Sequence, residues 1–284
     1  MKYYICAIAS VILWGSSFIA DKIAYASFSP LMLCMIRFAI SSLILNAVRI
    51  MRHDHVKMRR EDRKDILLSA LFGITAYYAF ENVAVSLTAA SDASLITASY
   101  PAVTVMVGMA FYHIFASRRQ IMGIIISMIG VVMLTVTDAG EAASGRLAGN
   151  IMLIVNGFFW AFYIYMIRRA APHYDSVTLS AWLITIGTVL FIPFLFLETP
   201  VIQNITPASV SAVLYLSAGC TVLALLLYNY SLKGVSAAAA AVIMNLMPVV
   251  GVVCSALILH ENISLTAVAG GVIIIAGVLI SSKK

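Results

Sequence analysis

Apolar runs long enough to cross a membrane recur from one end of the chain to the other, separated by short polar connections. A helix needs about 20 apolar residues to span a hydrocarbon core of about 30 Å. Only 11% of the residues are charged, against about 25% in soluble domains, so too little charge is present to cover a water-facing surface. The chain is therefore predicted to be an all-α integral membrane protein.

The apolar runs predict ten transmembrane helices, and no soluble domain fits between them. Their expected bounds are roughly 3–22, 30–50, 66–87, 92–114, 121–138, 147–167, 177–197, 209–231, 236–259 and 265–281. The longest polar connection, 51–64, contains His53 and His55, which we interpret as parts of a solvated loop. The four cysteines fall inside apolar runs, where cysteine behaves as a small hydrophobic residue. We predict neither a metal site nor a cofactor.

The basic residues predict the orientation in the membrane. Cytoplasmic loops carry an excess of Lys and Arg, and a cytoplasmic N-terminus places 15 of the 18 Lys and Arg on that side. The outer side then holds only Lys22 and Arg146, while Arg37 lies within a span. We therefore expect a multi-pass protein of the cell (inner or plasma) membrane with both termini in the cytoplasm. The net charge of +6 is interpreted as topology and not as nucleic-acid binding.

The sequence contains an internal repeat. A shift of 147 residues places identical residues on one another, namely Asn82 on Asn229, Pro101 on Pro248, His113 on His260, Ser117 on Ser264, Gly123 on Gly270 and Gly130 on Gly277. The repeat divides the chain into residues 1–138 and 139–284, each with five spans. Because five is odd, the second half is inverted relative to the first, and inverted halves permit alternating access to a site at their interface. A monomer suffices for this architecture, and a dimer stays open.

Three stretches carry a family resemblance: Trp14-Gly15, Arg37-Phe38 and the run LTAASDASLITASYPAVTVMVG at 87–108. Together with the related block 234–280, which includes Glu261, they resemble the EamA-type branch of the drug/metabolite transporter superfamily. The resemblance implies a two-fold pseudosymmetric transporter with a central cavity. Most members export amino acids, other metabolites or drugs, and proton antiport is often proposed for them. The first half has no glutamate that matches Glu261, so we interpret Glu261 as a loop or helix-cap residue.

One carboxylate, Glu81, stands inside the third span, in the stretch ITAYYAFENVAVS. An ionised residue near the bilayer centre costs about 2.5–3.5 kcal/mol on insertion scales, so such residues face a cavity or a partner. Arg37 and Glu81 both lie seven residues from the same predicted end of their spans, which is ~10 Å deep. Two interpretations stay open: a structural ion pair between them, or a site at which Glu81 binds a proton or a cationic group. A third is that the two side chains never meet.

Aromatic residues and buried amides occur together in several spans. Packing or the membrane interface explains any one aromatic residue, whereas an amide in hydrocarbon must find hydrogen-bond partners. The predicted binding or coupling residues are Glu81, Arg37, Trp14, Tyr77, Tyr78, Asn82, Tyr100, Trp160, Asn229 and Asn245. They predict a cavity with aromatic walls that suits a flat or amphipathic organic molecule.

Pro101 and Pro248 lie near the middle of the fourth and ninth spans. Proline removes a backbone donor and kinks a helix, and matching breaks in two halves indicate the binding site of a transporter. A kink that serves packing alone is the alternative.

The favoured function is a secondary-active transporter that exports small organic metabolites or drugs by alternating access, with coupling to protons left open. A sugar-nucleotide or phosphate-ester antiporter ranks lower, because it calls for several basic residues in the cavity and the spans offer only Arg37. A non-transporting receptor or scaffold has no need of two inverted halves. An enzyme is disfavoured, because 260-HENIS-264 lacks the second histidine of a zinc-protease motif and Glu81 is the only acidic residue identified deep in a span.

Overall fold

The computed structural model describes residues 2–136, 143–231, 234, 243–244 and 246–281. The first half contains α1 Lys2–Gly15, α2 Ser17–Ala24, α3 Pro30–Met51, α4 Arg63–Ala70, η1 Leu71–Ala76, α5 Tyr77–Leu87, α6 Ala90–Thr97, α7 Tyr100–Tyr112 and α8 Arg118–Val136. The second half contains α9 Ala143–Ala170, η2 Ala171–His173, α10 Ser176–Phe191, η3 Ile192–Leu197, α11 Pro207–Leu214, η4 Tyr215–Leu223, α12 Ala224–Ser231, α14 Leu246–Ile258 and α15 Leu265–Ser281. Within these residues the β-structure is one isolated bridge, between Phe28 and Ile202.

Six helical stretches are long and apolar enough to cross a membrane: Lys2–Ala24, Pro30–Met51, Arg63–Leu87, Gly145–His173, Ser176–Leu197 and Pro207–Tyr228. A seventh span results if α6 and α7, which are bent by 41° relative to each other, are taken as one. The helices Leu246–Ile258 and Leu265–Ile280 are apolar but shorter. The all-helical membrane class is confirmed, while the count of ten helices and the inverted repeat stay predictions.

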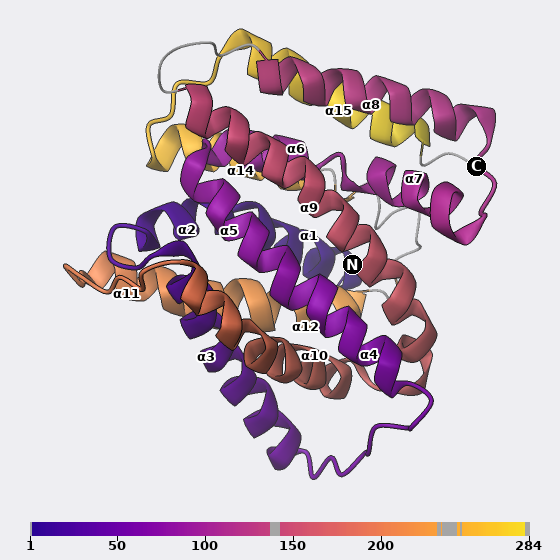
Figure 1. Ribbon diagram of the computed structural model, residues 1–284, viewed down its shortest axis with the longest axis vertical. Helices are drawn as coiled ribbons and strands as arrows, with labels where there is room; N and C mark the ends of the chain where they lie inside the picture. The colour runs from indigo at the N-terminus through magenta and orange to yellow at the C-terminus, as the bar shows by residue number, and fades with distance from the viewer. Residues whose placement is uncertain (1, 137–142, 232–233, 235–242, 245, 282–284) are drawn as a thin grey trace.

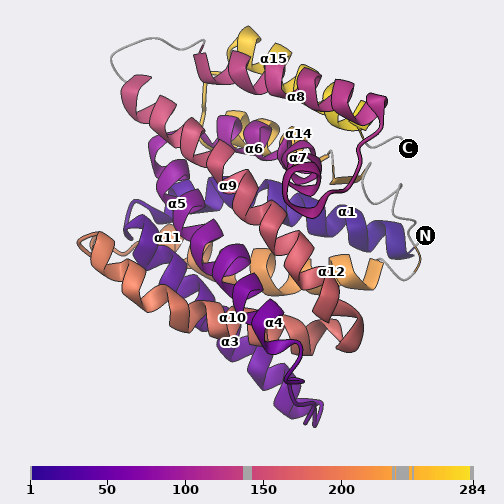
Figure 2. The same cartoon turned by 45° about the vertical axis from the view of Figure 1, so that its right-hand side comes forward.

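The helices stack side by side in one bundle (Figures 1 and 2). Helices α8 and α15 lie together along one side, and α3, α10 and α11 lie at the opposite side, with α1, α5 and α9 between them. Helix α1 begins and α15 ends on the same side of the molecule, to the right in Figure 2. The residues considered below as a functional site lie on α2, α3, α5 and η4, with further residues on α7 and α9.

Helices α8 and α15 approach each other through glycines. A Cβ atom on Gly130 would lie 2.6 Å from the Gly270 carbonyl oxygen, and a Cβ on Gly277 would lie 2.6 Å from the Gly123 carbonyl oxygen. Small residues at such crossings let helix backbones approach closely in a membrane. The shift of 147 residues relates Gly123 to Gly270 and Gly130 to Gly277, so it maps each of these two contacts onto the other. Two helices related by a two-fold axis would show the same exchange.

Two spans contain π-helical segments, η1 and η4. A shift of 147 residues moves 71–76 of η1 onto 218–223, within η4. π-helical turns are rare and occur often at functional sites. Of the matched prolines, Pro101 follows the 41° bend between α6 and α7, and Pro248 is a buried residue near the start of α14.

Glutamates of the second half cap helices of the first half. Glu261 Oε1 accepts a 2.9 Å hydrogen bond from the backbone N–H of Ala90, and Oε2 accepts one of 3.1 Å from that of Ser91, at the start of α6. Glu198 Oε1 accepts from the N–H groups of Leu31 and Met32 at the start of α3. A carboxylate there satisfies free donors and complements the helix dipole. The interpretation of Glu261 as a helix-cap residue is confirmed.

At the other end of α3, the loop 52–62 binds the segment 171–178, and we call this contact the loop clasp. Tyr174 donates a 2.7 Å hydrogen bond to Asp62 and accepts one of 3.0 Å from the N–H of Arg59. Asp54 accepts hydrogen bonds from the Thr178 hydroxyl, the Val56 N–H and the Arg49 guanidinium. His53 and His55 lie in this loop, and no group of three potential metal ligands occurs among the described residues.

The loop clasp is expected to weaken in acid. The hydroxyl of Thr178, the N–H of Val56 and the guanidinium of Arg49 favour the ionised form of Asp54 and lower its pKa from 3.8 to about 2. A lowered pKa means that the stabilisation is complete above the unfolded value of 3.8 and is lost as the pH falls through about 2. In thermal unfolding across this range, the stability difference between the wild type and Asp54→Asn should shrink towards zero. A difference that stays constant from neutral pH to pH 2 would contradict this assignment.

Candidate functional site

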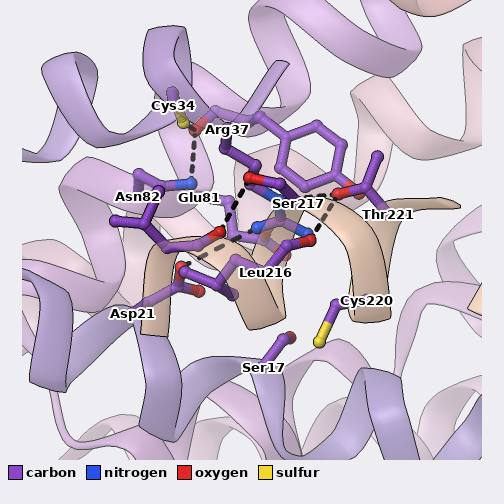
Figure 3. A network of polar contacts seen from close by, with 12 residues as sticks. Ser17, Asp21, Cys34, Arg37, Glu81, Asn82, Leu216, Ser217, Cys220 and Thr221 are labelled. Atoms are coloured by element: carbon purple, nitrogen blue, oxygen red, sulfur yellow. Dashed lines mark hydrogen bonds and ion pairs between the residues drawn. The ribbon is translucent and has the colours of Figure 1, made fainter. Parts of the chain in front are cut away.

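A buried charged cluster lies where α2, α3, α5 and η4 meet (Figure 3). Arg37 of α3 is only 2% exposed, and its Nη1 lies 3.7 Å from Asp21 Oδ1 of α2. Its Nε donates a 2.8 Å hydrogen bond to the hydroxyl of Thr221 in η4. The guanidinium carbon lies 4.9 Å from the centre of the Tyr78 ring, a cation–π distance. Arg37 thus connects two helices of the first half with the second half.

The π-helical geometry of η4 prepares Thr221 for this contact. The Thr221 hydroxyl donates to the carbonyl of Leu216, five residues earlier, at 2.9 Å. Its single proton is therefore used, and its oxygen presents lone pairs to Arg37. Ser41, one turn after Arg37, donates to the Ser217 carbonyl at 3.1 Å and holds α3 against the same segment.

The ion pair between Arg37 and Glu81 that the sequence allowed does not form, and Arg37 pairs with Asp21 instead. From the sequence, Asp21 was assigned with Lys22 to the outer end of the first span and was not considered a site residue. The structure continues α2 to Ala24 and buries Asp21 to 1% exposure. The signal available in the sequence was the depth of Asp21 in the membrane. Asp21 lies three residues from the end of its helix, which corresponds to ~5 Å, and a long arginine side chain can reach it there.

Glu81 lies in α5 and is 5% exposed. The hydroxyl of Tyr77, one turn earlier, donates a 2.7 Å hydrogen bond to its Oε1. Its Oε2 accepts no hydrogen bond from the described residues. Glu81 therefore keeps an unused acceptor in a buried position.

Aromatic rings from three segments form a connected group that includes Tyr77, the hydrogen-bond partner of Glu81, and we call them the aromatic cluster: Tyr77, Tyr78, Tyr100, Trp160 and Tyr163. The ring centre of Tyr77 lies 4.9 Å from that of Tyr78, 5.5 Å from Trp160 and 6.3 Å from Tyr100. Trp160 continues the contact to Tyr163 at 5.3 Å. Four predicted residues, Tyr77, Tyr78, Tyr100 and Trp160, are thus brought together, with Tyr77 in contact with the other three.

Asn156 extends the site towards α9. Its Nδ2 donates to the Tyr100 hydroxyl at 3.3 Å, and that hydroxyl donates to the Leu153 carbonyl at 3.1 Å. Asn156 Oδ1 is buried and has no hydrogen-bond partner among the described residues. Its spacing of four residues from Trp160 already placed the two on one face in the sequence, although the predicted site did not include Asn156.

The other predicted residues have structural partners. Asn82 Nδ2 donates to the Tyr78 carbonyl at 3.1 Å, and Asn82 Oδ1 accepts from Tyr25 at 3.1 Å. Trp14 Nε1 donates to the Cys220 carbonyl of η4 at 3.0 Å, and its ring lies 5.2 Å from that of Tyr228. The side chain of Asn229 and the whole of Asn245 lie outside the described residues.

Taken together, the site leaves acceptor atoms free on two residues. Glu81 Oε2 and Asn156 Oδ1 accept no hydrogen bond from the described residues, while Arg37 faces Thr221 through Nε and Asp21 through Nη1. A buried carboxylate beside aromatic rings is suited to a proton or to a cationic group that bears N–H donors.

The fold and this buried site define a multi-pass helical membrane protein with a polar centre between two parts of the chain. A family model described as "EamA-like transporter family" matches residues 1–136 and again residues 147–283 of this chain. The chain therefore belongs to the EamA-like transporter family.

Relatives of similar length support this membership. An uncharacterized transporter of Archaeoglobus fulgidus is 29% identical over 100% of this chain and 98% of its own length. The uncharacterized transporter YetK of Bacillus subtilis is 22% identical over 100% of this chain and 88% of its own. A crystal structure with 18% identity superimposes with a TM-score of 0.69 over 98% of this chain and 95% of that one, a likeness of fold alone.

Proposed function

We propose that this membrane transporter exports small organic metabolites or drugs by alternating access and that Glu81 is its binding or coupling carboxylate. The observation that carries the proposal is the free Oε2 of a buried glutamate that, among the described residues, accepts a hydrogen bond from the neutral Tyr77 alone. Arg37 is engaged by Asp21 and Thr221, so Glu81 is not needed as its counter-charge. A substrate with an aromatic or apolar body and a cationic group could pack its body against the aromatic cluster and pair its cationic group with Glu81.

Three features support alternating access. The candidate site lies where first-half helices meet η4 of the second half, as expected for a site between inverted halves. Tyr77, which is hydrogen-bonded to Glu81, packs against Tyr78 and Trp160, so a ligand that replaces this hydrogen bond would have to move packed rings apart. The glutamate caps at one end and the loop clasp at the other join the halves through hydrogen bonds that water can replace. The proposed direction is export, with both termini in the cytoplasm.

A phosphate-ester antiporter fits these residues less well. Its ligands carry phosphate oxygens, which bind to Arg and Lys. The one guanidinium of the site is Arg37, and its Nε and Nη1 already face Thr221 and Asp21.

Glu81→Gln is expected to keep the fold and to lose function. Glutamine retains an oxygen for the Tyr77 hydroxyl, so the free energy of unfolding should change by no more than the ~1 kcal/mol of one hydrogen bond. Binding should be measured as thermal shifts of purified protein against aromatic, cationic and zwitterionic metabolites at two pH values, because a ligand of the folded state raises its stability. Transport into proteoliposomes should then be measured for each compound that raises the melting temperature.

The matched control is Glu61→Gln, which changes an exposed glutamate of the 52–62 loop. It should respond like the wild type. A Glu81→Gln protein that binds and transports like the wild type would remove Glu81 from the mechanism. One that melts far below the wild type would make Glu81 a structural residue.

A further inference from the structure

Asp21 is a second buried carboxylate with unused acceptors. It is 1% exposed, and neither of its oxygens accepts a hydrogen bond from the described residues. Arg37 Nη1, at 3.7 Å from Oδ1, lies beyond hydrogen-bonding distance, because Arg37 directs its Nε to Thr221. Figure 3 shows the Asp21 carboxylate pointing towards the Arg37 guanidinium, with Glu81 and Asn82 of α5 nearby.

The three charged side chains of this cluster do not balance. With both carboxylates ionised, Asp21 and Glu81 contribute two negative charges and Arg37 one positive charge, which leaves one negative charge in excess. Lys22, the neighbour of Asp21 in the chain, forms no ion pair with Asp21 or Glu81 among the described residues. The remaining titratable groups around the cluster are neutral at neutral pH: Tyr25, Tyr77, Tyr78, Tyr100, Cys34 and Cys220. A buried, unpaired charge is costly, so one positive charge is required.

We propose that Asp21 and Glu81 together form a site for one exchangeable positive charge, which either a proton or the ammonium group of a protonated organic amine supplies. This inference rests on the proposed function and names its substrate class. The ammonium donates N–H groups to the free oxygens of Asp21 and Glu81, and the aromatic cluster receives the apolar body of the amine. One proton leaves as one amine enters, so charge is conserved.

The same requirement for one positive charge excludes other classes of ligand. A zwitterionic amino acid adds no net charge and brings a carboxylate next to two others. A neutral alcohol of the same shape cannot replace the proton. Among ligands that share one ring, only the amine should release a proton from the protein.

The test is infrared spectroscopy of the full-length protein in lipid, where a protonated carboxylic acid shows its own C=O stretching band. Wild-type protein at neutral pH should show this band, and 2-phenylethylamine should remove it with release of one proton per bound amine. Phenylalanine and 2-phenylethanol should leave it unchanged. In Asp21→Asn and in Glu81→Gln, Arg37 balances the remaining carboxylate, so the band and amine binding should both be lost. Asp65→Asn, outside the cluster, should behave like the wild type.

The infrared measurement on the wild-type protein tests the inference even if a variant folds poorly. Absence of the band, or its removal by phenylalanine or 2-phenylethanol as readily as by the amine, would overturn the inference. It would also fail if Asp21→Asn kept both the band and the amine response, since Glu81 would then act alone. Transport of the wider metabolite panel is a separate measurement: a solute whose transport is lost in Glu81→Gln but retained in Asp21→Asn would support the proposed function and reject this inference.

Discussion

Arg37→Gln is expected to lower the free energy of unfolding by about 3–5 kcal/mol, the cost of breaking a buried ion pair from one side. Glutamine cannot supply the positive charge that faces Asp21 at 3.7 Å or the cation–π contact with Tyr78. One of the two buried carboxylates, Asp21 and Glu81, would then lie in the cluster without a counter-charge. Unfolding in a mild detergent, followed by tryptophan fluorescence against denaturant, measures the loss.

A second substitution separates charge from packing. In Arg37→Gln combined with Asp21→Asn, one excess carboxylate is removed, so we expect the double variant to be more stable than Arg37→Gln alone. The exposed Arg59→Gln, whose ion pair with Glu61 is at the surface, should cost less than about 1 kcal/mol. Additive losses in the double variant would show that Asp21 and Arg37 do not interact energetically.

The pairing of Arg37 illustrates what the sequence could and could not predict. Hydropathy and charge asymmetry predict the membrane class, because spanning a bilayer constrains composition strongly. The depth of a residue follows from its distance to the helix end, and this brought Arg37 and Glu81 to one level. Which face of each helix is turned inward depends on helix packing, and here that rotation selects Asp21 as the partner of Arg37.

Irregular helix geometry accounts for other differences. The segments η1 and η4 have no sequence signature as clear as proline, yet η4 places Thr221 against Arg37. Similarly, the sequence predicted that Glu261 caps a helix without predicting that the helix is α6 of the other half. Spacing alone grouped Tyr77 with Glu81, because residues four apart on a helix share one face, and the structure places a hydrogen bond between them.

Gly130→Leu is expected to separate α8 from α15 and to destabilise the protein by about 3 kcal/mol, at the upper end of the usual range for overpacking. The new Cβ would lie 2.6 Å from the Gly270 carbonyl oxygen and 2.8 Å from Cγ1 of Ile274. Because one of these neighbours is backbone, no side-chain rotation relieves the contact, and the helices must move apart. Thermal unfolding in lipid nanodiscs measures the effect.

Gly277→Leu should cost about the same, because its Cβ would lie 2.6 Å from the Gly123 carbonyl oxygen in the contact that the 147-residue shift relates to the first. Once one leucine has separated the helices, the second meets less resistance, so the double variant should lose less stability than the sum of the two. Gly145→Leu is the matched control, since a Cβ there meets no atom within 4 Å. If Gly130→Leu were as well tolerated as Gly145→Leu, the close crossing of α8 and α15 would be wrong. A large loss for one partner and none for the other would contradict a two-fold relation between the helices and, with it, the inverted repeat on which alternating access depends.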